Sequence, residues 1–189
     1  VAEYGTTAAY YAHASAGCLH IRPLINLKTV EGVTAMKEMA HVAADLAHKF
    51  GGHMSGEHGD GLQRSELNET IFGSELYEAM RQFKFLWDPR GLMNPGKKVD
   101  APPMTENLRY GPDYAGRELK THLSFAADGG LLGAVEMCNG AAVCRKLKAG
   151  TMCPSFMATR DEKDSTRGRA NALRDALAGE GPARAAFTS

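Results

Sequence analysis

The residue types most suited to chemistry are concentrated between Gly51 and Arg64, in the run Gly-Gly-His-Met-Ser-Gly-Glu-His-Gly-Asp-Gly-Leu-Gln-Arg. These fourteen positions hold two histidines, one glutamate, one aspartate, one arginine and five glycines. Dense glycine lets the backbone adopt positive φ and approach a ligand closely, so the ionisable side chains between can converge on one point. A polar connection after a helix, with Gly51 as its C-cap, would explain Gly51 and Gly52 only. We therefore interpret the run as part of a functional site.

Two more histidines, His13 and His20, flank a turn of small residues near the start of the chain. Such a pair taken alone is more often structural. Together with Glu57, however, two imidazoles and one carboxylate suit a divalent cation such as zinc, manganese or iron(II), with coordination positions left for a substrate. The cation would act as a Lewis acid and would hold a substrate oxygen.

Three further side chains could work beside such a cation. His58 follows the glutamate of this set directly and is available as a base, because imidazole titrates near neutral pH. Arg22 and Arg64 are candidates for substrate binding, since a guanidinium can bind a carboxylate through two parallel hydrogen bonds.

The elements that must position these residues follow from the hydrophobic pattern. A short strand is predicted over 8–12, and a second β-prone segment over 18–27 is broken by Pro23, which suits a strand edge. The clearest helix covers 29–50, where Thr29 can cap the start and apolar residues recur every three or four positions. This helix delivers the chain into the glycine-rich run.

The later elements are less regular. A second helical region is predicted over 65–87, with Gly73 dividing it in two, and a turn-rich exit follows. Residues 101–136 are interpreted as a connecting segment with little regular structure, apart from a strand at 121–125. The segment 165–177 begins with serine and predicts a capped helix.

Composition limits the class of protein. The chain has 189 residues, enough for one domain or one and a half, and 22 basic residues balance 22 acidic ones. No basic surface therefore indicates a nucleic-acid partner, and no apolar run approaches the roughly twenty residues that span a bilayer. The first residue is Val1 rather than methionine and no leader pattern is present, so we expect a piece cut from a longer, cytoplasmic chain.

The four cysteines are Cys18, Cys138, Cys144 and Cys153, and the last of them precedes Pro154. Three of them cluster late in the chain. This layout is more typical of a metal or cluster site in a reducing compartment than of a disulfide framework. Cys18 is better explained as a small packed residue than as a ligand.

Three motifs follow one another within residues 1–100. They are the turn from His13 to His20 that contains Gly17, the sequence Ser-Gly-Glu-His-Gly-Asp-Gly from Ser55, and the sequence Asp-Pro-Arg-Gly-Leu-Met-Asn-Pro-Gly-Lys from Asp88. Together they resemble the C-terminal part of the FAD-linked oxidases, in the vanillyl-alcohol-oxidase superfamily, which includes D-lactate, glycolate and D-2-hydroxyglutarate dehydrogenases. The resemblance implies an α+β fold in which this region is the C-terminal part of the cap domain.

The same resemblance implies roles for single residues. His13, His20 and Glu57 would bind the divalent metal, and His58 would take the proton from the substrate hydroxyl or from the carbon that bears it. Asn94 would contact the flavin, and FAD would be held mainly by a domain upstream of this chain. The commoner family motif is His-x-Gly-Asp-Gly-Asn-x-His, whereas this chain has Ser-Ala-Gly-Cys between the histidines. The identity of the metal is left open.

Three sequence motifs within residues 137–189 resemble the iron-sulfur domain fused behind such flavoproteins. They are Cys-Asn-Gly-x-x-x-Cys-Arg-Lys, Met-Cys-Pro-Ser-Phe and Ser-Thr-Arg-Gly-Arg-Ala-Asn. This resemblance implies a mostly helical, ferredoxin-like segment in which Cys138, Cys144 and Cys153 bind a 4Fe-4S cluster. Three thiolates cannot close such a cluster, so a further ligand is expected downstream of this chain. A zinc knuckle or free thiols remain the alternative.

The resemblance therefore predicts a fragment of a flavin- and iron-sulfur-dependent dehydrogenase that oxidises a D-2-hydroxy acid, such as D-2-hydroxyglutarate, D-lactate or glycolate, to the 2-oxo acid. Electrons would pass from the flavin to the cluster and then to an unidentified acceptor, through which a cytoplasmic enzyme could associate with a membrane. The fragment alone is expected to be inactive. Two alternatives stay open: a non-catalytic electron-transfer or metal-binding module, and a metal hydrolase that needs no flavin.

Overall fold

A β-hairpin carries the first two candidate histidines in the computed structural model of the protein. Strand β1, Ala8–His13, pairs antiparallel with strand β2, Cys18–Pro23, across a single 3₁₀ turn and Gly17. Gly17 takes a φ of 64°, a left-handed conformation that costs glycine little. Strand β2 stops at Pro23 rather than at residue 27, and one more backbone hydrogen bond, from Leu24 N to Thr7 O at 2.9 Å, follows the proline.

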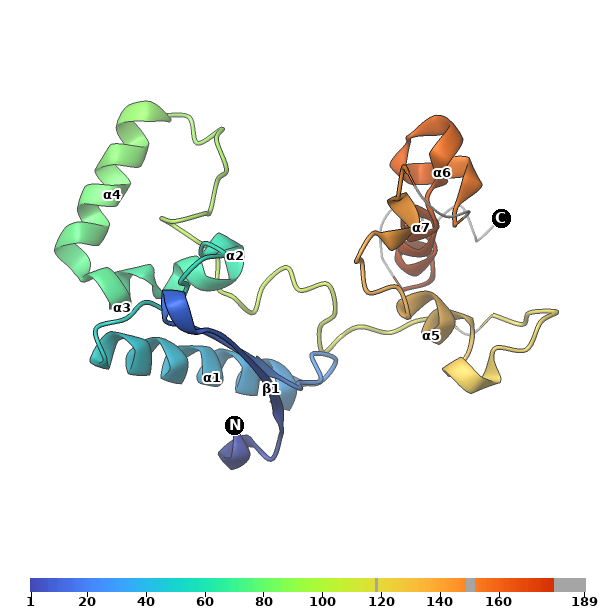
Figure 1. Ribbon diagram of the computed structural model, residues 1–189, viewed down its shortest axis with the longest axis horizontal. Coiled ribbons are helices and arrows are strands. Elements are labelled where there is room, and N and C mark those ends of the chain that lie inside the picture. The colour runs from blue at the N-terminus through green and yellow to red at the C-terminus, as the bar shows by residue number, and fades with distance from the viewer. Residues whose placement is uncertain (118, 149–151, 179–189) are drawn as a thin grey trace. The chain divides into compact units, whose positions relative to one another are not determined.

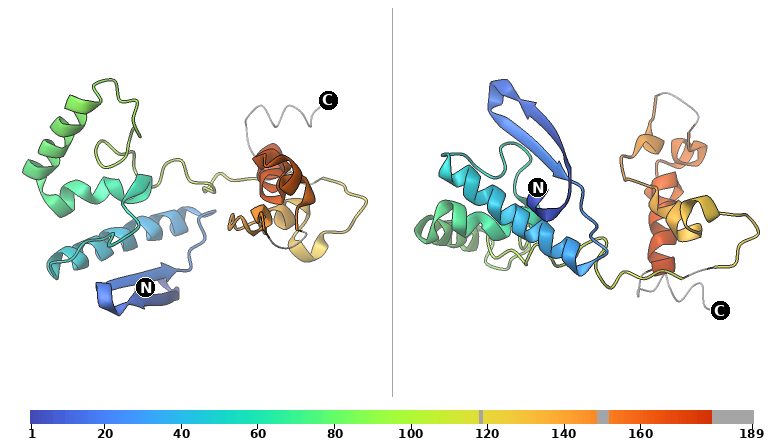
Figure 2. Two further views of the ribbon diagram at one scale, coloured as in Figure 1. Left: turned by 45° about the horizontal axis from the view of Figure 1, so that its top comes forward. Right: turned by 90° about the horizontal axis from the view of Figure 1, so that it is seen from below.

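The register of the hairpin determines which side chains share a face. Directly opposite residues of an antiparallel pair point to the same side, and the side alternates along each strand. Tyr11 lies opposite His20, and His13 lies opposite Cys18. One face, here called the site face, therefore carries Ala9, Tyr11, His13, Cys18, His20 and Arg22. Figure 2 shows the two strands as a narrow ribbon.

Helix α1, Val30–Lys49, confirms the predicted long helix. Thr29 caps its start, since the side-chain oxygen accepts a hydrogen bond from Gly32 N at 3.1 Å. The helix stops at Phe50, and Gly51, with a φ of 71°, turns the chain into the glycine-rich run.

Three further helices follow the glycine-rich run (Figure 1): α2, Gly61–Arg64; α3, Asn68–Phe72; and α4, Ser74–Trp87. Gly73 separates α3 from α4 with a φ of 78° and a ψ of 158°, a conformation essentially confined to glycine, so the predicted division is confirmed. The hydrophobic core here joins α1 to α3 and includes one side chain of the glycine-rich run. Its buried members are Ala44, Leu67, Ile71 and Met104, with Met36, Ala40, Met54 and Phe72 packed against them.

The structure describes residues 1–117, 119–148 and 152–178. The chain divides into two compact units, Val1–Asp113 and Tyr114–Ser189, so every element described so far belongs to the first unit. The division falls inside the predicted connecting segment.

The second unit contains short helices. Ser165 caps the longest of them, as predicted, since its buried hydroxyl accepts a hydrogen bond from Gly168 N at 2.8 Å. The strand predicted at 121–125 is wrong: residues 122 and 123 form bends, the other three have no regular structure, and the Thr121 hydroxyl donates to Leu123 O at 2.6 Å. The helices are α5, Leu131–Glu136; α6, Pro154–Thr159; and α7, Thr166–Ala178. No helix in either unit, over the described ranges, is long and apolar enough to cross a membrane.

The loop after α4 is held by one buried carboxylate. Asp88 accepts hydrogen bonds from Lys84 Nζ at 2.5 Å, from Leu92 N at 2.8 Å and from Met93 N at 2.8 Å. The hydrogen bond from Lys84, followed by those from Leu92 and Met93, lowers the pKa of Asp88 from 3.8 to about 2. The predicted turn at this point is therefore closed by its first side chain.

This carboxylate makes the stability of the first unit sensitive to acid. Because the folded pKa lies below the unfolded one, ionised Asp88 stabilises the fold above pH 3.8, and this stabilisation is lost as the pH falls toward about 2. Asp88→Asn is expected to lower the thermal midpoint at neutral pH and to flatten its fall across that acid range, as measured by circular dichroism. Asp113→Asn, at an exposed carboxylate, is the control. Equal effects of the two substitutions would contradict the prediction.

Candidate functional site

Three imidazoles converge on one carboxylate oxygen. Glu57 Oε1 lies 3.0 Å from His20 Nε2, 3.2 Å from His58 Nε2 and 3.6 Å from His13 Nε2. The His13 and His20 rings meet edge to face with centroids 4.9 Å apart, and the His20 and His58 centroids are 5.3 Å apart. The structure thus brings the three predicted metal ligands, here called the metal set (His13, His20 and Glu57), next to the predicted base.

The hairpin register explains where the two histidines of the metal set lie. His13 is opposite Cys18, and His20 is two residues further along β2, so the histidines are diagonal neighbours on the site face. The side chain of His20 is 18% exposed, whereas those of His13 and Glu57 are 55% and 41% exposed. His20 is therefore the inner member of the set, and the other two members are open to solvent.

Local hydrogen bonds shape the loop that carries the glutamate and the third imidazole. Ser55 N donates to His53 Nδ1 at 3.1 Å, and Ser55 Oγ donates to Gly59 O at 2.7 Å. The Gly59 carbonyl also accepts a hydrogen bond from Arg64 Nη1 at 3.3 Å. Residues before and after Gly59 therefore hold its carbonyl in place. Arg64, which we predict to bind substrate, is one of them. The sequence analysis did not identify the role of His53.

Close packing of this loop on the hairpin joins the two halves of the site. A Cβ added to Gly56 would lie 2.7 Å from Cys18 Sγ, a distance that real Cβ atoms do not reach. A side chain at position 56 would therefore force the Cys18 thiol to shift, whereas glycine leaves it in place. The position of Cys18, partly buried against the loop, agrees with its predicted role as a small packed residue.

Asp60, in the same run, is part of the scaffold rather than of the site. It is buried, and it accepts hydrogen bonds from Lys98 Nζ and from Asn68 Nδ2, the latter at 3.3 Å. Asn68 Nδ2 also donates to Lys98 O, and Lys98 N donates to Ser65 Oγ, both at 2.9 Å. Through these hydrogen bonds the network ties the loop around Lys98 to the end of the glycine-rich run.

The geometry of the metal set fits a divalent cation. One ligand atom from each member lies within 4.8 Å of the other two. His20 Nε2 is buried and has no hydrogen-bond partner among the described residues, although Glu57 Oε1 is 3.0 Å away, so an additional ligand would satisfy this nitrogen. Two imidazoles and one carboxylate match the preference of zinc and of iron-type cations. Within the described ranges, no other three His, Cys, Asp or Glu side chains gather their ligand atoms in this way.

The remaining predicted site residues lie outside the metal set. Arg22 is on the site face, and its guanidinium carbon is 5.2 Å from the centroid of the Tyr11 ring. Asn94 is exposed in the loop after α4, where its side-chain oxygen accepts a hydrogen bond from Lys97 Nζ at 3.3 Å. Tyr11 was missed in the sequence, although the alternation of the strand places it on the same face as His13.

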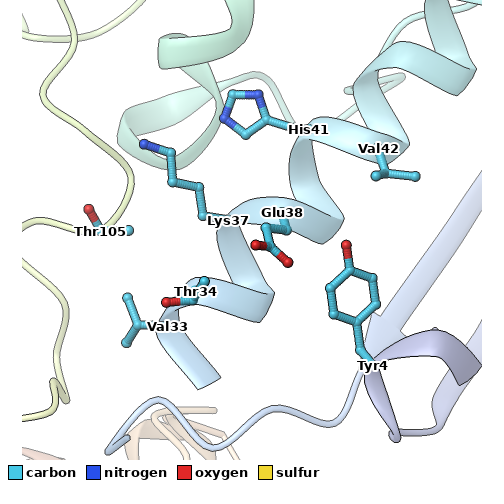
Figure 3. A pocket seen from close by; sticks show the side chains of 8 residues that line it. All are labelled: Tyr4, Val33, Thr34, Lys37, Glu38, His41, Val42 and Thr105. Carbon is cyan, nitrogen blue, oxygen red and sulfur yellow. The ribbon is translucent and has the colours of Figure 1, made fainter. Parts of the chain in front are cut away.

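A hollow of about 470 Å³ lies along one side of α1 (Figure 3), and no candidate site residue lines it. Two of its charged or polar side chains are already engaged, because Lys37 Nζ is 3.2 Å from Glu66 Oε1 and Tyr4 hydrogen-bonds with Glu38, and His41 Nε2 lies 4.0 Å from the same Glu66 oxygen. Burial, followed by the nearby carboxylates of Glu38 and Glu3, raises the pKa of Tyr4. We therefore assign no ligand to this hollow.

Comparison with protein families identifies the first unit. Residues 1–98 match the family described as FAD linked oxidases, C-terminal domain. The chain belongs to this family, and the matched residues include the hairpin, the metal set and His58. The predicted family resemblance is confirmed over this region, and the mixture of helices with one small antiparallel sheet agrees with it.

Similar proteins cover more of the chain. A D-2-hydroxyglutarate dehydrogenase of Pseudomonas putida is 34% identical over 184 residues, which are 95% of this chain and 18% of that protein. A D-2-hydroxyglutarate dehydrogenase of Escherichia coli is 32% identical over 182 residues, 93% of this chain and 17% of that protein. A D-lactate dehydrogenase of Archaeoglobus fulgidus is 41% identical over 99 residues, 51% of this chain and 21% of that protein. The chain thus spans about a fifth of the length of these relatives. No solved structure matches it significantly.

The convergence of the metal set predicts that loss of one ligand weakens cation binding. Glu57→Gln keeps the size of the side chain and removes its charge, and His20→Ala removes the buried nitrogen. Each is expected to lower the affinity for Zn²⁺ or Mn²⁺ at least about 100-fold, because altering even the partners of metal ligands costs 10- to 100-fold. Titration calorimetry with each ion measures this, with His48→Ala, an exposed histidine of α1, as the control. Unchanged affinity in both ligand variants would exclude the site.

Proposed function

We propose that this chain is the part of a flavin-dependent dehydrogenase that binds a D-2-hydroxy acid and takes its hydroxyl proton. The substrate would be of the D-2-hydroxyglutarate, D-lactate or glycolate type, and the product would be the 2-oxo acid. The observation that carries the proposal is the convergence of three imidazoles on Glu57 Oε1, in a chain that belongs to the FAD-linked oxidases. The names of the similar proteins, D-2-hydroxyglutarate and D-lactate dehydrogenases, support the same type of reaction.

The metal set would hold a divalent cation, which supplies a Lewis acid for the hydroxyl and carboxylate oxygens of the substrate. His13 and Glu57 are open to solvent, so a substrate can reach the cation position from that side. Arg22 and Arg64 are proposed to bind substrate carboxylate. Asn94 is proposed to contact the flavin, which supplies the oxidant when bound.

His58 is proposed to be the base. Its side chain is 60% exposed and its ring lies beside that of His20, so a substrate bound at the metal set would be adjacent to it. The imidazole would accept the hydroxyl proton as the C2–H bond breaks, and a bound flavin would supply the oxidant that takes up this hydrogen with its electron pair. The C2–O bond becomes a carbonyl, so the substrate loses two electrons and two hydrogens. The imidazolium that results is stabilised by Glu57 Oε1, which is 3.2 Å from His58 Nε2.

We also propose that the late cysteines bind an iron-sulfur cluster of the 4Fe-4S type. Cys144 and Cys153 are both buried and pack in one cluster with Phe156. The hydrogen bond from Phe156 N, followed by that of the Thr166 side chain, lowers the pKa of Cys153 and so favours the thiolate form that binds iron.

The first turn of α7 supports the same proposal for the other two cysteines. The hydrogen bond to Glu162, and then the charge of that carboxylate, raises the pKa of Arg167, and Cys144 and Cys138 contribute in the same direction. The Arg167 guanidinium therefore lies in the neighbourhood of both cysteines. The proposed enzyme is cytoplasmic and passes its electrons through the cluster to a separate, unidentified acceptor.

Replacement of the proposed base tests the catalytic role. In the flavin-loaded enzyme, His58→Ala is expected to slow flavin reduction by D-2-hydroxyglutarate or D-lactate about 10²- to 10⁴-fold, because a positioned base contributes this much. Stopped-flow absorbance of the flavin measures the rate, and metal content should stay at the wild-type level. A metal hydrolase would instead show activity without flavin. Unchanged flavin reduction in the variant would favour a structural role for Glu57 and His58.

Serine substitutions test the cluster. Cys138→Ser, Cys144→Ser and Cys153→Ser are each expected to lower the content of iron and acid-labile sulfide in anaerobically purified protein. Iron-sulfur clusters prefer thiolate ligands, and a serine hydroxyl stays protonated at neutral pH. Cys18→Ser, which changes a cysteine of the first unit, is the matched control. Stoichiometric zinc without sulfide, or no metal at all in the wild-type protein, would contradict the proposal.

A further inference from the structure

The site face of the hairpin carries a positive charge that the metal set does not use. Arg22 follows His20 by two positions on β2, so its Cα lies about 7 Å further along the same face. Within the part of the chain that the structure describes, no carboxylate lies within ion-pair distance of its guanidinium, which instead contacts the ring of Tyr11. An arginine that has no carboxylate partner and lies beside a substrate site can bind an anionic group of the substrate.

Tyr11 controls where that charge lies. It is opposite His20 and diagonal to Arg22 on the site face, and its ring centroid is 5.2 Å from the guanidinium carbon. A guanidinium that stacks on an aromatic ring loses much of the freedom of its long side chain, so less ordering is needed when it binds an anion. The side chain of Tyr11 is still accessible, with 56% of the residue exposed, so the stack borders the open side of the site.

We propose that Tyr11 is a positioning residue that holds Arg22 ready for the second carboxylate of a dicarboxylic D-2-hydroxy acid. This inference rests on the proposed function above. The metal set would take the hydroxyl and the first carboxylate, and the guanidinium further along the site face would take the second. D-2-Hydroxyglutarate has two methylene groups between these two ends, whereas D-lactate and glycolate have no second carboxylate to reach Arg22.

Steady-state kinetics of the flavin-loaded enzyme test this inference with two substrates of equal chain length. D-2-Hydroxyglutarate has the second carboxylate, and D-2-hydroxypentanoate has a methyl group in its place. Arg22→Gln is expected to raise the KM for the diacid about 10- to 100-fold rather than to lower kcat, because it removes a charged hydrogen-bond partner that acts in binding. Tyr11→Leu is expected to raise the same KM about two- to five-fold, the usual effect of an exposed cation–π contact.

Two control variants separate positioning from a general effect on the hairpin. Tyr11→Phe keeps the ring under the guanidinium and should behave as the wild type. Tyr10→Leu changes the adjacent tyrosine, which is 66% exposed and lies on the opposite face, and should also leave the KM unchanged. Metal content, measured for every variant, reports whether the hairpin still holds its histidines in place.

The outcomes distinguish this inference from the function on which it rests. A diacid KM that Arg22→Gln and Tyr11→Leu leave unchanged would overturn the inference while the dehydrogenase assignment stands. Equal KM values of the wild-type enzyme for D-2-hydroxypentanoate and D-2-hydroxyglutarate would overturn the inference too. If none of the D-2-hydroxy acids reduces the flavin of the wild-type enzyme, the proposed function fails and this inference fails with it.

Discussion

The packing of the Glu57 loop against the hairpin is the contact on which the site depends. The histidines of the metal set come from a two-stranded ribbon, whereas the carboxylate comes from a loop more than thirty residues later. These elements can share one cation only if their backbones come close, and at Gly56 an added Cβ would lie 2.7 Å from the sulfur of Cys18. Once they meet, the negative charge of Glu57 faces three imidazoles, and a divalent cation among them would satisfy both the carboxylate and the buried nitrogen of His20.

The loop can keep this position because the residues on either side of it are fixed. Met54 packs against the hydrophobic core, and Asp60 is buried in a network with Asn68 and Lys98. Between these points the loop bonds to itself through Ser55 and Gly59. The candidate site residues therefore stand on an exposed loop whose two ends are held by buried packing and hydrogen bonds, an arrangement common in binding sites.

Within the second unit, polar groups gather around the late cysteines. The start of α7 presents a capping serine, a guanidinium and backbone N–H groups near cysteines that are far apart in the sequence. At Cys153 these surroundings lower the pKa of the thiol and so favour the thiolate, the form that metal ions require. The buried packing of Cys144 and Cys153 around Phe156 would also keep water away from a cluster bound there.

The amino-acid sequence by itself determined the features of this protein that depend on near neighbours. The cap at Thr29, the break at Gly73 and the capped start of α7 all follow from local backbone preferences, and the residue types of the metal set were evident from the sequence. Tertiary structure alone decided which ionisable residues lie together at the candidate site. Asp60 has the same glycine-rich surroundings in the sequence as Glu57, yet it is buried and paired with Lys98. Tyr11 meets Arg22 only because of the strand register, and residues 121–125 pair with no strand in the described structure. These outcomes depend on partners distant in the sequence, whose positions no local pattern encodes.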